Sequence, residues 1–370
     1  MKTIRRLIYA EILRAIGFVT LAFLLLFFFF DFVDRLGDIA EDGTSGSAVS
    51  RALLGATLLV PGHLYELLPI AVLIGAIYVM ARLAESSEYT ILRTSGLRPQ
   101  RALGTLLTLG LVFVVLTFVV GDYIAPSADR MAQSLQTRYL SGLTTGRTGA
   151  WMKDRQEGKR NFSVNVGALG ADGAMSQIRL FEFDQATNQP LSIVKAARGH
   201  FGSDASWTLY DVERRDYSQT DGSRPAVTID RLTEWRWPTT ISSDMVAAAL
   251  LSPDRMQTFD LFQYIHHLRD NGQSAQRYEI EFWRKVFYPL SCLVMMVLAL
   301  PFAYLHFRSG NITGYVFLGV LVGISFFLLN NVFGFIGNLR NWEPWAAAAA
   351  PGIIYSLLSL GAFGWLVLRQ

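Results

Sequence analysis

The residue types that most often carry out catalysis or bind metal ions are rare in this sequence. Its 370 residues include five histidines and a single cysteine, Cys292. His266 and His267 are adjacent, so on a helix they point in different directions and cannot hold one metal ion together. A single cysteine excludes an intramolecular disulfide and a cysteine-cluster metal site. Nucleophile-elbow, zinc-protease and phosphate-loop motifs are missing from the sequence. The sequence therefore predicts no catalytic residue, no metal site and no cofactor bound by this chain.

The polar stretch 82–96 is better suited to docking a partner than to catalysis. It is typical of a short helix closed by Gly96, with Glu88, Ile91 and Leu92 on one face and Glu85 beside them. Two interpretations remain open: an interfacial helix resting on lipid, or a docking helix on which a cytoplasmic partner pushes. Acidic residues suit an arginine of a partner better than an anionic lipid surface. The candidate docking residues are Glu85, Glu88, Tyr89, Ile91, Leu92 and Arg93.

Aromatic residues accumulate at Phe27–Phe30 and Phe32, where the first apolar segment ends, next to Asp31 and Arg35. A lipid-facing carboxylate at this depth would cost about 2–3 kcal/mol, and a wet cavity removes that cost. The pattern is typical of an aromatic belt in the headgroup region. It is equally typical of the wall of a cavity for an amphiphile with acyl chains and a charged head.

Two further features concern the packing of helices. Gly319 and Gly323 have the small-xxx-small spacing that lets membrane helices approach closely. Pro289 and Pro301 predict kinks in the fourth apolar segment. No apolar segment has the central carboxylate, lysine or histidine expected of an ion-coupled transporter. If the protein moves a substrate, we therefore expect the energy to come from another subunit.

These candidate residues belong to a chain of uneven composition. It is 51% hydrophobic and 17% charged, and residues 122–285 contain 40 of its 63 charged residues. A polar, charge-balanced block between two apolar parts excludes a simple cytosolic enzyme and a disordered chain. The formal net charge of +3 is too small and too dispersed for a nucleic-acid-binding protein.

Six apolar segments are long enough to cross a bilayer, which takes roughly 20 residues of a helix. The first could resemble a signal peptide, but its apolar run is too long and no small-residue cleavage site follows directly, so it is interpreted as an anchor. The six segments are Ile16–Phe30, Leu67–Met80, Ala102–Val120, Val286–Phe307, Ile312–Leu329 and Trp345–Leu368.

The basic residues near the ends of these segments predict the orientation of the chain. With the N-terminus inside, ten basic residues fall in the inner segments and three in the short outer loops. Short connections rich in Lys and Arg stay in the cytoplasm. We therefore expect both termini to be cytoplasmic and the polar block between the third and fourth spans to lie outside.

The block from about 140 to 250 has the pattern of a β domain. Short runs rich in β-branched and aromatic residues alternate with turn signals about every dozen residues, which predicts an all-β sandwich or roll. A helix should follow, with Phe259, Phe262, Ile265 and Leu268 on one face and a C-cap at Asn271-Gly272. The five predicted strands are Phe162–Val166, Gln177–Phe183, Leu191–Ala196, Trp207–Val212 and Ala226–Ile229.

The predicted fold class is a membrane α plus β protein: six transmembrane helices (3+3) with an inserted extracytoplasmic all-β domain. Residues 1–122 hold spans one to three, with a short cytoplasmic helix at about 82–95. Residues 123–275 form the β domain with its flanking helices, and residues 276–370 form spans four to six.

Several short stretches, in this order and spacing, resemble the LptF/LptG family of permease subunits of the lipopolysaccharide export ABC transporter, its LptG members more than its LptF members. The resemblance covers essentially the whole chain. Each motif alone is modest, and their order makes the match specific. The stretches are Phe32–Leu36, Glu88–Gly96, Ala125-Pro126, Met131-Ala132, Trp151–Asp154, Gly272–Tyr278, Pro289–Ser291 and Val294–Met296.

The resemblance implies a non-catalytic permease of a Gram-negative inner membrane, with a periplasmic β-jellyroll. Its implied partners are the paralogous permease LptF in a heterodimer, the dimeric cytoplasmic ATPase LptB, which uses ATP and Mg²⁺, and LptC, which leads to a periplasmic bridge. The implied substrate is lipopolysaccharide, extracted from the outer leaflet of the inner membrane; nucleic acid is not expected as a partner.

The resemblance also implies roles for particular residues. Glu88 occupies the coupling-helix position that meets the ATPase groove. The exit of span one is usually lysine-rich in the family, whereas this sequence has Asp31, Gly37 and Asp38 there, so Arg130 and Arg138 are the substitute candidates for the lipid headgroup. A lipid cavity lined by spans one and five would include Phe29, Phe32, Arg35, Phe317, Leu321 and Phe326.

Two other classes of protein remain as alternatives. Another ABC-type permease with an extracytoplasmic domain, for lipoprotein release or as a mechanotransmitter, usually has four spans per chain, and the six found in this sequence argue against it. A membrane-anchored enzyme or receptor would need an active site in the β domain, for which no catalytic constellation is found.

Overall fold

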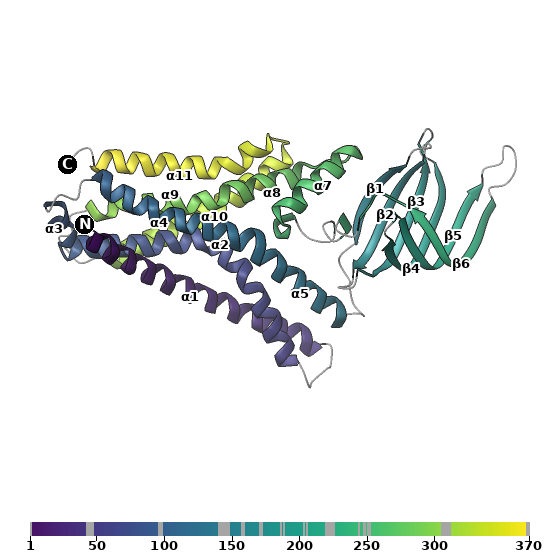
Figure 1. The fold of residues 1–370 in the computed structure, drawn as a ribbon, viewed down its shortest axis with the longest axis horizontal. Coiled ribbons are helices and arrows are strands. Elements are labelled where there is room, and N and C mark those ends of the chain that lie inside the picture. Colours follow the sequence, from purple (N-terminus) through teal and green to yellow (C-terminus); the bar gives the residue numbers. More distant parts are fainter. Residues whose placement is uncertain are drawn as a thin grey trace. The chain divides into compact units, whose positions relative to one another are not determined.

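The computed structural model divides the chain into two compact units, Met1–Asp129 with Glu279–Gln370, and Arg130–Tyr278. The first unit is helical and the second contains the sheet (Figure 1). The structure describes residues 2–41, 48–94, 99–139, 149–156, 160–169, 173–185, 187, 189–202, 204, 206–218, 226–242, 245–246, 249, 253–304 and 312–367.

The described residues include six helical segments long and apolar enough to cross a membrane. Three are formed by α1 (Lys2–Glu41), α2 (Ala48–Glu85), and α4 (Pro99–Val119) with the π-helical η1 (Val120–Ile124) and α5 (Ala125–Tyr139). The fourth is segmented into α8 (Gln276–Phe287), η3 (Tyr288–Leu290), α9 (Ser291–Leu298) and η4 (Leu300–Tyr304). The last two are α10 (Ile312–Leu339) and α11 (Pro344–Val367).

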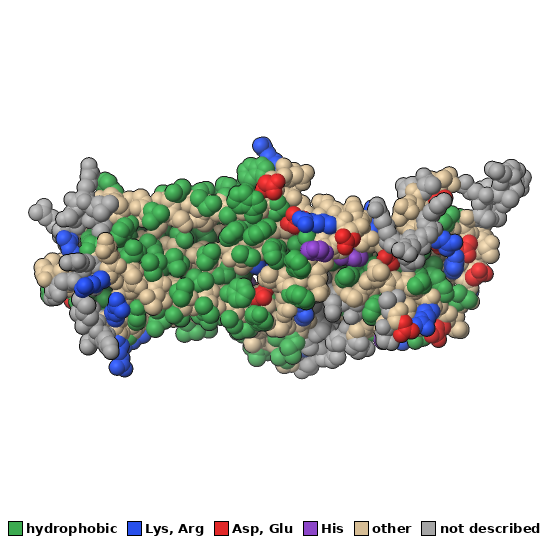
Figure 2. Space-filling view, turned by 45° about the horizontal axis from the view of Figure 1, so that its top comes forward, with side chains coloured by type: hydrophobic (Ala, Val, Ile, Leu, Met, Phe, Trp, Pro, Cys, Tyr) green, Lys and Arg blue, Asp and Glu red, His purple; other side chains and the backbone are tan. Residues whose placement is uncertain are grey.

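The helical unit has two ends that differ in their connections. At one end, called the insert end, span three leads out to residues 130–278 and span four returns from them. At the other, called the α3 end, the short helix α3 (Glu88–Thr94) joins spans two and three. Hydrophobic side chains cover most of the surface between the two ends, and basic side chains gather at the α3 end (Figure 2). This distribution is the one that the positive-inside rule associates with a cytoplasmic end.

Span two is the central helix of the unit, because α1, α10 and the fourth span all pack against it. Most residues of its apolar part are buried, whereas most residues of span one face outward. Gly75 of α2 meets Ile16 of α1, where an added Cβ would lie 2.7 Å from the Ile16 side chain. A helix surrounded by neighbours becomes apolar all round, which explains why α2 shows no distinct polar stripe.

Helix irregularities recur in spans two, three and four. Pro61 and Pro69 lie inside α2, and residues 120–124 of span three form a π-helical turn. The 3₁₀ turns η3 and η4 contain Pro289 and Pro301, where the sequence predicts kinks. A proline removes one backbone donor and its ring displaces the carbonyl four residues earlier, so helices bend at these points.

The second unit is built on one six-stranded antiparallel sheet in which every strand pairs with the next along the chain. The inserted β domain is therefore confirmed, and the strand order is that of a meander. Sequence reasoning missed the first strand, which contains a short polar run. The strands are β1 (Ala150–Gln156), β2 (Arg160–Leu169), β3 (Met175–Asp184), β4 (Pro190–Gly202), β5 (Ser206–Ser218) and β6 (Ala226–Pro238).

A line of irregular residues bends the sheet across its strands. Gln177 of β3 and Asp211 of β5 have φ values of +56° and +55°, and on either side of each the buried residues are three apart. The pairing register is unbroken across both residues, so each is a kink without an inserted residue, and the side-chain alternation reverses there. The bend brings both halves of each strand onto one apolar core, which includes Trp207 and Trp237 with ring centroids 5.3 Å apart.

The helix α7 (Thr258–Asp270) packs with a different face from the one expected. Ile265 and Leu268 are buried, but Phe259 and Phe262 are 65% and 50% exposed. The predicted face was wrong because Leu261 and Tyr264, instead of Phe259 and Phe262, are the buried residues near the start of the helix. The predicted C-cap is confirmed: Gly272 has φ +64°, and the N–H of Gln273 donates to the carbonyl of Leu268 at 2.8 Å.

Candidate functional site

The loop between spans two and three is divided differently from the single helix expected at 82–95. Span two continues to Glu85, and α3 begins at Glu88 after a sharp turn in which Ser87 has φ +59°. The N–H of Ile91 donates to the carbonyl of Ser87 at 3.1 Å, which closes the first turn of α3. The predicted closure at Gly96 lies outside the described residues. The turn at Ser87 makes α3 a separate element from α2.

One face of α3 is fixed to the bundle. Tyr89 is 3% exposed, and its ring meets Tyr304 of η4 edge to face with centroids 5.1 Å apart. The guanidinium carbon of Arg93 lies 5.6 Å from the centroid of the same Tyr304 ring, a cation–π contact. Burial raises the pKa of the Tyr89 hydroxyl, so this side chain stays neutral. Tyr89 was predicted as a docking residue, but its burial means that it anchors the helix instead of reaching a partner.

The other face of α3 is open to contact. Glu88 and Ile91 are exposed, Ile91 by 62%, and Glu85 is exposed at the end of α2. Leu92 is half-buried against the core. A carboxylate next to an exposed isoleucine on a rigidly held helix can bind a basic, partly apolar groove.

Spans one and five flank span two and share a small apolar cluster with it. Leu67, Ile70 and Ile74 of α2 form the centre of this cluster. The side chains from the flanking spans that pack on it are Val19, Phe23, Leu24 and Phe27 of α1 and Val316 and Val320 of α10. The two spans therefore both border this face of span two, and their outward faces are strongly apolar there.

The predicted cavity residues of spans one and five lie at different positions along the axis of span two. The ring of Phe27 in α1 packs against His63 with centroids 4.9 Å apart, whereas Gly319 of α10 lies against Ile74 and Ile77. His63 and Ile77 are separated by about 20 Å along α2, at about 1.5 Å per residue. Spans one and five run in the same direction, so the first turns of α10 lie beside the middle and α3-end part of span one. Phe317 and Leu321 therefore lie much closer to the α3 end of the helical unit than Phe29 and Phe32 do.

Phe326 was wrongly placed in the lining of the predicted cavity. It is 2% exposed, and its ring packs between Tyr288 and Tyr355, with centroid distances of 6.3 and 5.1 Å. The side chains of Phe29, Phe317 and Leu321 are exposed, by 59%, 62% and 48%. Hydropathy alone cannot separate the two kinds of position, because a membrane helix is apolar on both its buried and its lipid-facing sides.

Gly319 and Gly323 lie buried on the face of α10 that meets α2. An added Cβ at Gly319 would be 2.9 Å from Ile77, and one at Gly323 would be 2.8 Å from Ile70. Both positions are therefore close-approach sites between spans five and two.

The acidic residue at the exit of span one has a partner that sequence reasoning missed. The Asp31 carboxylate lies 2.8 Å from Nε2 of His63, and both side chains are about one-fifth exposed. Arg35 folds against span two, where an added Cβ at Gly55 would lie 2.5 Å from its guanidinium. Spans one and two are antiparallel neighbours, so counting residues outward from their connecting loop would have narrowed the candidates for a partner of Asp31.

The two basic candidates for a lipid headgroup belong to α5. Arg130 forms an ion pair with Asp260 of α7. The side chain of Arg138 lies outside the described part of the helix. Because a carboxylate neutralises Arg130, its role as a headgroup ligand stays a prediction.

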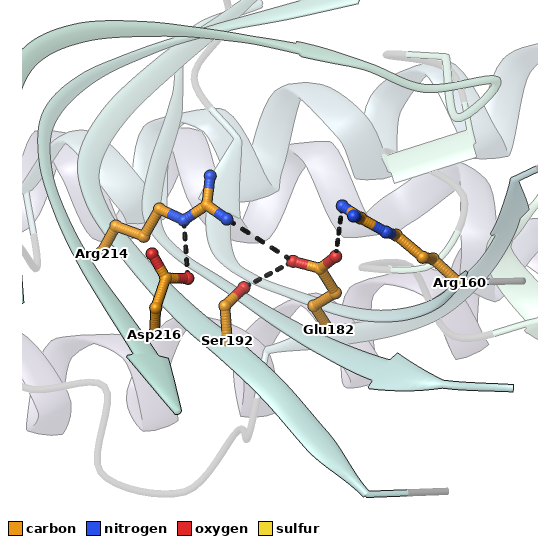
Figure 3. Close-up of polar contacts among 5 residues, drawn as sticks. All are labelled: Arg160, Glu182, Ser192, Arg214 and Asp216. Carbon is orange, nitrogen blue, oxygen red and sulfur yellow. Dashed lines mark hydrogen bonds and ion pairs between the residues drawn. The ribbon is translucent and has the colours of Figure 1, made fainter. Parts of the chain in front are cut away.

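A polar cluster of the β unit is formed around Glu182 of β3 (Figure 3). Its carboxylate accepts a hydrogen bond from the hydroxyl of Ser192 at 2.6 Å and pairs with Arg160 at 2.8 Å. Arg214 lies 4.0 Å from the same carboxylate and donates through Nε to Asp216 at 2.9 Å. The cluster joins four strands, β2 to β5, and contains no pair arranged as nucleophile and base. Among the described residues no group of three or more His, Cys, Asp or Glu could hold a metal ion.

Comparison with known proteins gives one family for nearly the whole chain. Residues 6–369 match the family described as lipopolysaccharide export system permease LptF/LptG. The chain is 28% identical to the lipopolysaccharide export system permease protein LptG of Haemophilus influenzae over 373 aligned residues, which cover 100% of the chain and 99% of that relative. It is 29% identical to the protein of the same name from Escherichia coli K12 over 344 residues, which cover 92% of the chain and 90% of that relative.

Proposed function

The chain belongs to the LptF/LptG family and is a permease subunit of a lipopolysaccharide export ABC transporter, and from this premise we propose how it couples ATP hydrolysis to lipid extraction. A separate cytoplasmic ATPase, dimeric LptB, binds ATP and Mg²⁺ and moves α3. The paralogous permease LptF completes the membrane part, and LptC accepts the lipopolysaccharide on the periplasmic side.

The observation that carries this proposal is the way α3 is held. Its exposed face offers Glu88 and Ile91, while Tyr89 and Arg93 fix the opposite side to Tyr304 at the end of span four. A helix fixed in this way transmits a push to span four instead of yielding to it. An interfacial helix resting on lipid would instead turn its apolar residues toward the bilayer and leave its charges in water.

The free-energy cost of removing lipopolysaccharide from the membrane explains why another subunit must supply energy. Lipopolysaccharide carries several acyl chains, and exposing them to water costs about 0.8 kcal/mol per CH₂ group. The face of span two between spans one and five gives these chains an apolar surface while they leave the leaflet. We assign Phe29 and Phe32 of span one to the insert end of this path, and Phe317 and Leu321 of span five to the part nearer the α3 end.

The proposed orientation places the α3 end and both termini in the cytoplasm. The β unit then lies in the periplasm of a Gram-negative cell, and the insert end of the spans lies in the outer leaflet of the inner membrane. The basic side chains at the α3 end support this orientation.

A membrane pull-down at native expression, followed by mass spectrometry of the copurifying proteins and lipids, tests the proposal. We expect a soluble ATPase, a second six-span permease and bound lipopolysaccharide. Proteoliposomes of the purified complex should then release lipopolysaccharide only with ATP and Mg²⁺. Recovery of the chain alone, or with an unrelated ATPase and phospholipid, would contradict the proposed partners.

A further inference from the structure

The helix α7 exposes two aromatic side chains although its opposite face is buried. Phe259 and Phe262 are 65% and 50% exposed, and His266 is exposed one turn after Phe262. The three residues share one side of the helix because they are three and four positions apart. The rings of Phe262 and His266 lie with centroids 4.5 Å apart. An exposed apolar patch with a polar border marks contact with a membrane or with another protein.

The start of α7 is tied to the end of span three. Asp260 forms an ion pair with Arg130 of α5. Arg130 lies in the last turn of the helical run Pro99–Ala132, which is long and apolar enough to cross a membrane. The next residue, Met131, is 62% exposed, so the apolar surface of this span continues to the point where Asp260 is held.

The middle of α7 is tied to the start of span four. The ring of Tyr264 meets the ring of Tyr278 edge to face, with centroids 4.7 Å apart. Tyr278 is the third residue of the candidate span Gln276–Tyr304. Only residues 271–275 separate α7 from this span, and Gly272 in the left-handed region turns the chain there. Both ties lie within the unit Arg130–Tyr278.

These two ties set the level of α7 relative to a bilayer. Arg130 and Tyr278 mark the points at which the chain leaves the membrane and enters it again. A helix held at both points lies at the level of the lipid headgroups. Helices at this level bury aromatic and aliphatic side chains at the boundary between headgroups and acyl chains, and keep polar side chains in water. The level of α7 therefore favours lipid over a second protein as the partner of Phe259 and Phe262.

The buried face of α7 reaches the sheet. His267 is 7% exposed, and its ring is hydrogen-bonded to the backbone of Lys153 in β1. The side-chain amide of Asn271 donates to the carbonyl of His267 at 2.9 Å and closes the last turn of the helix. A single helix therefore contacts the first strand on one side and offers aromatic rings on the other.

We propose that α7 is an interfacial helix that inserts Phe259 and Phe262 among the lipid headgroups on the insert side of the membrane and thereby seats the β unit on that surface. The partner is the phospholipid that surrounds the protein, not the lipid that it transports. The inference goes beyond the proposed function, because it requires neither the ATPase nor lipopolysaccharide.

The test measures where a spin label at Phe262→Cys lies, in a Cys292→Ala background. The full-length chain, with the subunits that copurify with it, is reconstituted into phospholipid nanodiscs. Power-saturation electron paramagnetic resonance compares collisions of the label with oxygen, which concentrates in lipid, and with nickel ethylenediaminediacetate, which stays in water. Ile229→Cys, an exposed apolar position of β6, is the matched control. The ratio of the two collision rates cancels local crowding, and we expect a severalfold higher oxygen-to-nickel ratio at Phe262→Cys.

Two results would overturn the proposal. A ratio at Phe262→Cys equal to that at Ile229→Cys would place the helix in water. Few collisions with either reagent at Phe262→Cys would mean that another protein covers the stripe. Both results would leave the proposed function intact, because the measurement is made without ATP.

A second set of variants uses a label at Phe259→Cys. Phe262→Glu should remove most of the oxygen excess at this label, because a carboxylate draws the stripe out of the lipid. Phe262→Leu should retain the excess. Ser274→Glu adds the same charge at an exposed position in the connection between α7 and α8, and should also retain it. Equal ratios in Phe262→Glu and Ser274→Glu would show that Phe262 does not hold the helix in the membrane.

Discussion

Polar groups are held in two ways in this protein, around Glu182 in the sheet and around Lys285 and Tyr288 in the spans. In the sheet, the Glu182 carboxylate meets the side chains of Arg160, Ser192 and Arg214, while the strand backbones remain paired with one another. In the spans, the acceptors are backbone carbonyls at a proline-interrupted turn and a π turn. The first arrangement adds side-chain bonds to a complete ladder, whereas the second adds side-chain donors to backbone carbonyls beside irregular helical turns. The difference matters for motion, because a side-chain bond between two helices can be released without breaking the backbone ladder of a sheet.

The largest effect is expected where the side-chain cluster of the sheet is broken. Glu182→Ala leaves the guanidinium groups of Arg160 and Arg214 without their shared carboxylate, and we expect the β unit to lose about 2–4 kcal/mol of stability. Hydrogen exchange of β3–β5 in the full-length protein should speed up accordingly. Glu234→Ala, at an exposed position of β6, is the control. Equal exchange in the two variants would mean that the cluster around Glu182 adds no stability to the sheet.

A smaller effect is expected at the π turn of span three. Gly121→Ala would place a methyl group 2.3 Å from the Tyr65 ring, so the ring or the helix must shift. We expect a loss of about 1–3 kcal/mol from overpacking, measured as a lower thermal midpoint of the purified complex. Gly104→Ala, in the same span with nothing within 4 Å of the new Cβ, should raise or maintain that midpoint. A normal midpoint for Gly121→Ala would show that span three adapts freely at this turn.

At the α3 end, the contact to be tested joins the chain to the ATPase, whereas the contacts above lie within the chain. Glu88→Lys reverses the charge of the exposed face without touching Tyr89, so the helix should remain anchored. We expect about tenfold weaker binding of the ATPase, measured by titrating the purified subunit onto the reconstituted permease. Thr90→Lys adds the same positive group at an exposed neighbouring position and is the control. Equal affinities for the two variants would remove Glu88 from the docking face.

The smallest effect concerns a titratable group in the β unit. Burial lowers the pKa of His267 from its usual 6.5, although Asp154 nearby acts in the opposite direction. The unfolded chain therefore binds a proton more readily than the folded one. The stability that His267 contributes is complete above about pH 6.5 and is lost as the pH falls below that value.

We expect hydrogen exchange in α7 to accelerate between about pH 6.5 and the lower folded-state pKa, after correction for the intrinsic pH dependence of exchange. His267→Gln should abolish the acceleration. His266→Gln, at the adjacent exposed position, should preserve it. An unaltered profile in His267→Gln would assign the acid sensitivity to another group.

Much of the site could be predicted because its elements are defined locally. The exposed Glu88 and Ile91 of α3 follow from a polar stretch between two apolar spans. The close approach of Gly319 and Gly323 to span two follows from small residues four apart. The burial of Tyr89 could not be predicted, because it depends on Tyr304, more than two hundred residues later in the chain. The pairing of Asp31 with His63 likewise depends on the axial offset between two helices.

The sequence by itself determined the six spans, the inserted β domain and the position of the helix between spans two and three, because transfer of apolar residues into a bilayer and strand periodicity are properties of short stretches. Only the tertiary structure decided that Phe326 is buried between other side chains and that Phe317 and Phe29 lie at different positions along the helix axes. It also decided that Lys285 and Tyr288 contact the irregular turns of two other spans. The reason is physical: hydrophobicity sets how deep a helix lies in the membrane, but its rotation and axial register are set by the shapes of the neighbouring helices.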